Sequence, residues 1–393
     1  MRDAFVYAYA RTPFGRFGGA LADSRPDDLA ATVISGLMDR APALDPTRVD
    51  DVCWGCANQA GEDNRNVGRM AVLLAGLPTS VPATTVNRLC GSSLDATIQG
   101  SRAIESGDAD VLLVGGVESM TRAPWVLPKP SRAYPAANAE LVSTTLGWRL
   151  VNRAMPEGWT ASLGECNELL SERFGISRKR QDEFATRSHR LAAAAWDDGF
   201  YDSWVVPVGG LTRDEGVRPD STVEKLAGLK PSFRAEGTIT AGNASPLSDG
   251  ASAVLLGAAG AIPDLDPIAR IAGRGVFAND PRDFGYAPVE ATNRALARAG
   301  ITWSDVAAVE LNEAFAVQSL ACLDAWDVDP EAVNARGGAI AIGHPLGASG
   351  GRVLATLAER LRVSGDRWGV AAICIGVGQG LAVVLENVAG STS

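Results

Sequence analysis

The chain has 393 residues, too many for one ordinary hydrophobic core, so we expect two or three domains. Its composition, 46% hydrophobic and 21% charged, is typical of a soluble globular protein and excludes a disordered, collagen-like or coiled-coil chain. The net charge of −10 argues against nucleic acid as a partner, and six cysteines in a chain this long predict reduced thiols without a disulfide framework.

No stretch reaches the ~18 apolar residues that a membrane helix needs. The longest candidate, residues 370–385, is interrupted by Gly376, Gly378, Gln379 and Gly380. The first residues lack the run of ~7–15 apolar residues found in signal peptides. We therefore expect a cytoplasmic protein that does not bind membranes.

In chain order, residues 28–40 have the pattern of an amphipathic helix, and residues 50–55 and 111–114 have that of buried strands. This alternation predicts an α/β fold with a mostly parallel, helix-covered sheet. From about residue 121 to 249 the pattern changes to loops containing proline and tryptophan, with one long helix at 178–198. We interpret this segment as an insertion, after which strand–helix alternation resumes.

A weak internal repeat indicates two related halves. Ser-Gly-Asp turns at 106–108 and 364–366 differ by 258 positions, and the same offset places Gly116 on Cys374. The second half also carries an extra segment that contains His344. We expect halves at 1–262 and 268–390, with a loop domain inserted at about 121–249, that share a scaffold and form one composite site.

Cys90 lies just before an expected helix at 93–105, where the positive end of the helix dipole favours a thiolate. Gly91 leaves room beside it for a bulky thioester. A lone cysteine is more often a core residue, so its position alone leaves both interpretations open. Cys53 and Cys56 have Cys-x-x-Cys spacing, but no second pair or nearby histidine completes a metal site, and we expect no metal.

The chain has two histidines. His189 lies in the long expected helix and is interpreted as a surface residue. His344, in a loop fixed by glycines and Pro345, suits a general base or an oxyanion donor, although it could be an ordinary turn residue.

Two further motifs follow expected strands. Cys374 comes after the apolar residues 370–373, and the glycines that follow it would expose N–H groups suited to an oxyanion. Asn312 follows the strand expected at 307–311 and precedes a helix; taken alone, it is best interpreted as a helix cap.

Together these motifs resemble the thiolase family over the whole chain. Cys90 stands where thiolases carry the acylated nucleophile, and residues 312–315, 343–345 and 374–376 match the other active-site motifs in order. The resemblance implies a fold of two βαβαβαββ halves in five layers with an inserted loop domain. It also implies a homodimer or homotetramer.

The resemblance further implies catalytic roles. His344 would help to take the proton from Cys90, whose thiolate would attack a 3-oxoacyl-CoA in a ping-pong reaction, with Cys374 as the second acid and base. His344 and a water held by Asn312 would stabilise the enolate. The amides of Cys90 and Gly376 would hold the other oxyanion.

For coenzyme A, a co-substrate and not a permanently bound cofactor, the resemblance points to one set of residues. Ser245 matches the serine that touches the pantetheine, and Arg218, 27 residues before it, matches an arginine on the nucleotide. The other expected CoA contacts are Leu163, Ala244 and Phe315. Ser162-Leu163-Gly164 replaces a common His-Met-Gly, which leaves the acyl specificity open.

Residues 55–67, 147–152 and 374–380 resemble the β-ketoadipyl-CoA branch, which cleaves 3-oxoadipyl-CoA to succinyl-CoA and acetyl-CoA. Arg149 is the candidate partner for the terminal carboxylate. It could equally be a solvated surface residue. The alternatives are a general fatty-acid or acetoacetyl-CoA thiolase, a ketosynthase-type condensing enzyme, and a non-catalytic acyl-CoA carrier. The ketosynthase type is disfavoured because it would need a second active-site histidine or a His–Asn pair with a different loop, whereas His189 is badly placed and Cys374 fits thiolases. The carrier is disfavoured because Cys90, His344 and Cys374 are all present.

Overall fold

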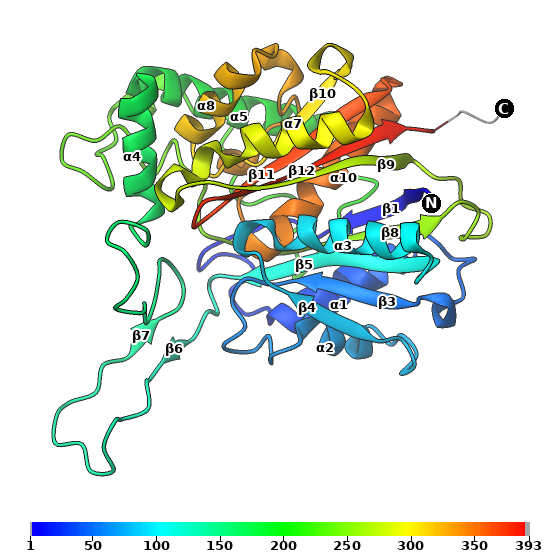
Figure 1. The fold of residues 1–393 in the computed structure, drawn as a ribbon, viewed down its shortest axis with the longest axis horizontal. Coiled ribbons are helices and arrows are strands. Elements are labelled where there is room, and N and C mark those ends of the chain that lie inside the picture. The colour runs from blue at the N-terminus through cyan, green and yellow to red at the C-terminus, as the bar shows by residue number, and fades with distance from the viewer. Residues whose placement is uncertain (1, 390–393) are drawn as a thin grey trace.

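Two sets of strands form the centre of the computed structural model, which describes residues 2–389; the expected outer limits of the halves, 1 and 390, lie outside that range (Figure 1). In the first set the order is β4-β3-β5-β8-β1, and in the second it is β9-β12-β11-β10. The strands are β1 (Ala4–Arg11), β3 (Asp51–Gly55), β4 (Ala83–Val86), β5 (Val111–Ser119), β8 (Ser248–Ala258), β9 (Ala269–Ala278), β10 (Ala308–Leu311), β11 (Trp368–Ile375) and β12 (Gln379–Asn387).

The two sets repeat one pairing scheme. β3 runs parallel to β5 and β5 antiparallel to β8, just as β10 runs parallel to β11 and β11 antiparallel to β12. Two residue pairs between β1 and β9, Phe5 with Arg270 and Val6 with Ala269, join the sets into one sheet. The short β2 (Gly15–Arg16) adds to β8.

Helices complete five layers (Figure 1). α3 (Ser92–Ser106) and α10 (Leu346–Ser364) lie between the two sets of strands. α1 (Pro26–Met38) and α2 (Val67–Leu74) cover the outer face of the first set, and α7 (Ala287–Ala299) and α8 (Ala316–Trp326) cover the second. This five-layered α/β arrangement agrees with the architecture that the resemblance implied. The expectation of a mostly parallel sheet was wrong, because within residues 2–389 only β3 with β4, β3 with β5 and β10 with β11 pair in parallel.

The two central helices pack closely because small residues face each other. A Cβ added to Gly350 would lie 2.4 Å from the backbone nitrogen of Leu94. The Gly351 N–H donates to Ser93 Oγ at 2.9 Å. This contact brings the first turns of α3 and α10 together, and these turns carry the candidate site.

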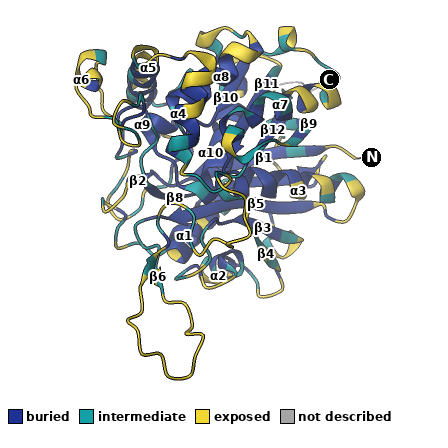
Figure 2. Cartoon of the chain, turned by 60° about the vertical axis from the view of Figure 1, so that its left-hand side comes forward, coloured by how far each residue is buried: buried dark blue, intermediate teal, exposed yellow. Residues whose placement is uncertain are grey.

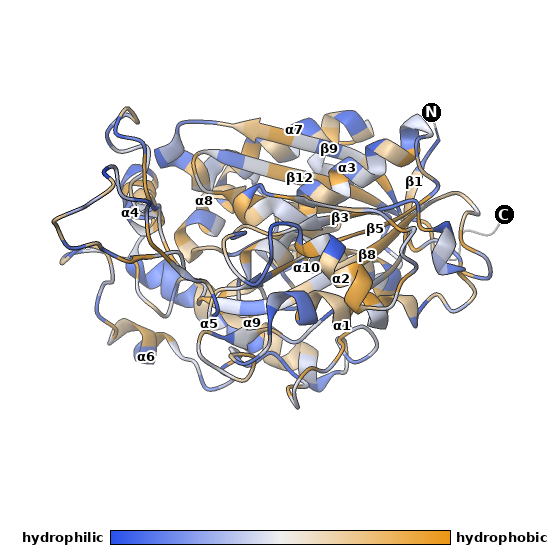
Figure 3. Cartoon of the chain, turned by 90° about the horizontal axis from the view of Figure 1, so that it is seen from below, coloured by the Kyte–Doolittle hydropathy of each residue, from blue (hydrophilic) through white to orange (hydrophobic). Residues whose placement is uncertain are grey.

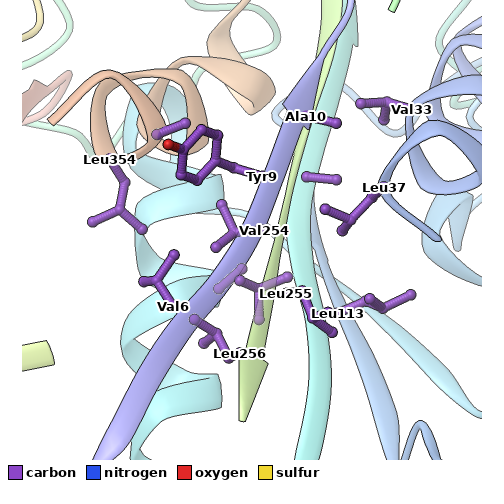
Figure 4. Packing of buried hydrophobic residues seen from close by; sticks show 14 of the residues in the cluster. Val6, Tyr9, Ala10, Val33, Leu37, Leu113, Val254, Leu255, Leu256 and Leu354 are labelled. Carbon is purple, nitrogen blue, oxygen red and sulfur yellow. The ribbon is translucent and has the colours of Figure 1, made fainter. Parts of the chain in front are cut away.

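The core on one side of this layer shows how the strands are placed (Figure 4). Val254 and Leu256 of β8 face the central helices, while Leu255 faces α1. A bulge in β1 between Val6 and Ala8 lets Val6 and Tyr9 share one face despite their odd spacing. Figure 3 shows hydrophobic residues concentrated in the central strands, and no helix within residues 2–389 is long and apolar enough to cross a membrane.

Between β5 and β8 lies the segment interpreted as an insertion. Its β6 (Trp125–Val126) and β7 (Val142–Ser143) begin an exposed extension from the body (Figures 1 and 2). The helix expected at 178–198 is confirmed as α5 (Arg178–Asp197), but α4 (Leu163–Phe174) and α6 (Val223–Ala227) were not expected. The remaining helical elements are α9 (Ala339–Ile342) and the 3₁₀ turns η1 (Pro46–Arg48), η2 (Leu89–Gly91), η3 (Pro281–Tyr286), η4 (Trp303–Asp305) and η5 (Pro330–Ala332).

Candidate active site

Cys90 lies in η2, immediately before α3, and is 5% exposed. Its turn packs on α10, and Leu89 before it has a left-handed φ of 47°. Burial raises the pKa of the Cys90 thiol to about 11, although the N–H groups of Gly376 and of Cys90 itself, both directed at the sulfur, act in the opposite direction. The helix start therefore does not yield the thiolate expected from the sequence, because burial outweighs the dipole.

Cys374 is the next-to-last residue of β11 and lies beside this sulfur. Its side chain is fully buried, and burial, followed by the neighbouring Cys90, raises its pKa well above the ordinary value. In the turn that follows, a Cβ on Gly376 would lie 3.0 Å from Trp148 Cη2 and 3.4 Å from Leu163 Cδ2. The absence of a side chain at Gly376 thus lets Trp148 and Leu163 pack directly against this turn.

Two hydrogen bonds hold His344 in the loop before α10. Its N–H donates to Ser248 Oγ at 3.0 Å, and its Nδ1 lies 2.5 Å from Ser349 Oγ. Ser349 has a single hydroxyl proton, which it donates to the Pro345 carbonyl at 2.9 Å. The hydroxyl therefore accepts from Nδ1–H, and this tautomer leaves Nε2 unprotonated and able to act as a base.

The imidazole is neutral in this position. Burial first, and the cation of Arg352 second, lower the pKa of His344 to about 3. A neutral imidazole with an unprotonated Nε2 can accept a thiol proton. The resulting imidazolium can then donate to a developing oxyanion.

Asn312 continues β10 and is fully buried. Its N–H donates to the Ala372 carbonyl at 2.9 Å, and its side-chain Nδ2 lies 3.4 Å from His344 Nε2. α8 begins only at Ala316, so the interpretation of Asn312 as a helix cap was wrong. Its backbone extends the strand ladder and its side chain points to the histidine.

Four of the residues expected to contact CoA lie close together in the structure. Ala244 pairs with Phe315 in an isolated bridge, and both the N–H and the hydroxyl of Ser245 donate to the Ala314 carbonyl at 3.0 Å. Phe315 and Leu163 pack on the cluster that contains Cys374. These residues therefore adjoin Cys374.

Arg218 is exposed and has no ion-pair partner among the residues that the structure describes. Its backbone N–H donates to His189 Nδ1 at 3.2 Å. His189 is 4% exposed, so its interpretation as a surface residue was wrong. Burial, and next the charge of Arg218, lower the pKa of His189 to about 4, which keeps the ring neutral and able to accept this hydrogen bond.

Glu118, which no sequence motif pointed to, is a buried carboxylate that links the two halves. It accepts N–H groups from Ala57 at 2.9 Å, Asn58 at 3.0 Å and Gly347 at 2.9 Å. Burial raises its pKa to about 7. An acidic residue within the apolar strand run that begins at Val111 was the available signal.

Comparisons with known proteins agree with this geometry. The thiolase N-terminal domain matches residues 4–259 and the thiolase C-terminal domain matches residues 265–387. The chain is 49% identical to an Escherichia coli K12 protein named 3-oxoadipyl-CoA/3-oxo-5,6-dehydrosuberyl-CoA thiolase, with 99% of this chain and 100% of the relative covered. It is 48% identical to a Pseudomonas putida β-ketoadipyl-CoA thiolase, over 99% of this chain and all of the relative.

Human mitochondrial 3-ketoacyl-CoA thiolase has a similar solved structure, with a TM-score of 0.93, 36% identity and 99% of each chain covered. The same protein has also been solved in complex with CoA, at the same TM-score and identity. Family domains, full-length relatives and fold all agree, and the chain belongs to the thiolase family of acyltransferases.

Proposed function

We propose that this thiolase cleaves 3-oxoadipyl-CoA with CoA to succinyl-CoA and acetyl-CoA, through an acyl group carried on Cys90. The observation that carries the proposal is the placement of two buried thiols side by side, with the Gly376 and Cys90 N–H groups directed at the Cys90 sulfur. A neutral base, His344, lies at the start of the helix that packs on the Cys90 turn.

In the first half-reaction His344 Nε2 takes the Cys90 proton, and the thiolate attacks the 3-oxo carbon. The N–H groups of Cys90 and Gly376 stabilise the oxyanion that forms on that carbon's oxygen. The bond between C2 and C3 then breaks, leaving the succinyl group on Cys90 and an acetyl-CoA enolate, which is stabilised from the side of His344 and Asn312. Cys374 protonates this enolate at carbon, and acetyl-CoA leaves.

In the second half-reaction a new CoA thiol gives its proton to the Cys374 thiolate and attacks the succinyl thioester on Cys90. The same two N–H groups hold the second tetrahedral oxyanion. Succinyl-CoA leaves, and the thiolate of Cys90 recovers its proton. Covalent catalysis of this kind replaces one difficult step by two easier ones.

CoA would bind along the candidate contact residues described above. Ala244, Ser245, Phe315 and Leu163 would contact the pantetheine, since they adjoin Cys374. The exposed guanidinium of Arg218, on a loop fixed by His189, would bind the nucleotide phosphates.

Arg149 supports the choice of a substrate with a terminal carboxylate. It follows Trp148, which lies over Gly376, and its Nη2 donates to Asn58 Oδ1 at 3.1 Å. Within residues 2–389 it has no carboxylate partner. A half-buried cation with a neutral partner, close to the acyl site, can pair with the substrate carboxylate, which would be costly to bury unpaired. The relatives named for 3-oxoadipyl-CoA point to the same substrate.

The test compares kcat/KM for 3-oxoadipyl-CoA and 3-oxohexanoyl-CoA in the wild type and in Arg149→Met. A charge pair of ~1.5–3 kcal/mol should give the diacid a preference of about 10–150-fold, which Arg149→Met should abolish. Arg153→Met, a nearby change of the same kind, is the control and should keep the preference. Equal efficiency on both substrates in the wild type would contradict the proposed substrate and favour a general 3-ketoacyl-CoA or acetoacetyl-CoA thiolase.

A further inference from the structure

Behind Asn312 and His344 lies a buried cation to which neither the family motifs nor the proposed mechanism gives a role. Arg352, in the second turn of α10, has 0% of its surface exposed. Its Nη2 donates to the side-chain oxygen of Asn312 at 3.0 Å. The same helix begins just after His344, so Arg352 is fixed relative to both residues.

This hydrogen bond determines which way the Asn312 carboxamide faces. A guanidinium has five N–H donors and no acceptor, so only the carboxamide oxygen can lie against it. The NH₂ end must then point to the opposite side, where Nδ2 lies 3.4 Å from His344 Nε2 and 3.5 Å from Nδ1. The flipped carboxamide, with its NH₂ against the cation, would bring two donors together.

The burial of Arg352 is not explained by an ion pair with a nearby carboxylate. Its Nη1 lies 4.0 Å from Glu310 Oε2, and Glu310 already pairs with Arg360 through its other oxygen at 2.7 Å. Among the described residues, Nε and Nη1 of Arg352 have no hydrogen-bond partner. Burying a cation with so few partners is costly, and such costs are concentrated at functional sites.

We propose that Arg352 is a positioning residue that holds the Asn312 carboxamide with its oxygen inward and its NH₂ toward His344, so that this NH₂ serves the enolate formed in carbon–carbon cleavage. The inference rests on the proposed thiolase reaction but not on which acyl chain is cleaved. Arg352 also contributes, after burial, to the low pKa that keeps His344 neutral. Its effect on the enolate passes through Asn312, and it does not touch substrate.

Two partial reactions of acetyl-CoA separate this role from a structural one. Exchange of the acetyl hydrogens with D₂O requires the enolate. Transfer of the acetyl group to labelled CoA requires Cys90, the proton transfers through His344 and Cys374, and the oxyanion held by the N–H groups of Cys90 and Gly376, but it does not require the enolate. In Arg352→Met we expect hydrogen exchange to fall about 10²–10³-fold, as for loss of one oxyanion donor, while acetyl transfer falls less than about tenfold.

The matched control is Arg360→Met, which removes an arginine from the same helix and the same Glu310 but leaves the Arg352 contact with Asn312 intact. Its two partial reactions should change by the same factor. The double variant Asn312→Ala/Arg352→Met should lose no more exchange than Asn312→Ala alone, because Arg352 acts through Asn312. If Arg352→Met does not fold, Arg352→Lys is used instead. It keeps the positive charge but lacks the planar guanidinium, and it should also lose hydrogen exchange more than acetyl transfer, to a smaller degree.

The proposal is overturned if Arg352→Met, or Arg352→Lys in its place, keeps wild-type exchange or lowers exchange and transfer equally. It is also overturned if the losses of Asn312→Ala and Arg352→Met multiply in the double variant. Failure of the proposed function would give a distinguishable result, because the wild-type enzyme would then show neither hydrogen exchange nor acetyl transfer.

Discussion

The sulfur of Cys90 lies at the first turn of α3, where a helix dipole should favour the thiolate, yet burial raises its pKa to about 11. A fully enclosed sulfur loses more by desolvation than the dipole and two N–H groups return. The free enzyme therefore holds a thiol, and activation waits for His344 to take the proton as the substrate binds. Enclosure also protects the nucleophile from oxidation between turnovers.

This predicts how alkylation of Cys90 by iodoacetamide depends on pH. Because the pKa is raised and only the thiolate reacts, the rate should increase about tenfold per pH unit from neutrality to about pH 10. The modified Cys90 peptide is quantified by mass spectrometry at each pH. A rate that levels off near pH 7 would show a preformed thiolate and contradict this account.

The other residues of the site could be predicted from the sequence to different degrees. Cys90, His344, Cys374 and Gly376 were proposed from local motifs. In the structure the Cys90 sulfur lies beside Cys374 and the Gly376 N–H, and His344 precedes the helix that packs on the Cys90 turn. Arg352 and Ser349 could not be assigned and His189 was wrongly assigned to the surface, since the role of each depends on a contact or a degree of burial that no local pattern encodes. The partner of Arg352 is 40 residues away in the chain.

Among the helices and strands, long periodic segments were predicted best. The expected helix at 28–40 and strands at 50–55 and 111–114 are confirmed as α1, β3 and β5. α4 was missed, although its start carried a signal. Ser162 stands three residues before Glu165, a capping pattern, and its hydroxyl accepts the Glu165 N–H at 3.1 Å.

Glu118, near the end of β5, connects elements of both halves, and its replacement should weaken that connection. In Glu118→Gln an NH₂ replaces one of the two oxygens that accept the Ala57, Asn58 and Gly347 N–H groups, so at least one donor faces another. We expect the free energy of unfolding in urea to fall by about 1–3 kcal/mol. Glu183→Gln, on the exposed side of α5, should change it by less than about 0.5 kcal/mol. Unchanged stability in Glu118→Gln would show that the carboxylate does not connect the halves.

The molecule as a whole repeats one strand and helix scheme, and the Ser-Gly-Asp repeat indicated this correctly. α3 and α10 both end at a left-handed glycine, Gly107 and Gly365, at the positions where the repeat was found. The joining of both strand sets through two residue pairs of β1 and β9 could not be predicted, because it depends on how the halves pack. The extension between β6 and β7 was likewise invisible in local patterns.

This extension predicts self-association, in agreement with the homodimer or homotetramer expected from the sequence. It exposes large apolar side chains, among them Trp125 at 67%, Tyr134 at 94% and Leu141 at 53% (Figure 2). Exposed apolar groups on such a projection are typical of interaction sites. Light scattering should give a mass two or four times that of one chain, and Trp125→Ser/Tyr134→Ser/Leu141→Ser should lower it. A monomeric wild type would contradict this prediction.

The central claim, an acyl group carried on Cys90, is tested most directly by trapping that group. The enzyme is mixed with acetyl-CoA without a second substrate, quenched in acid and digested, and each cysteine peptide is analysed by mass spectrometry. We predict that acetyl appears on Cys90 and disappears when CoA is added before the quench, with Cys90→Ala as the unlabelled control. Acetyl on Cys374, Cys53 or Cys56 with Cys90 unmodified would contradict the account.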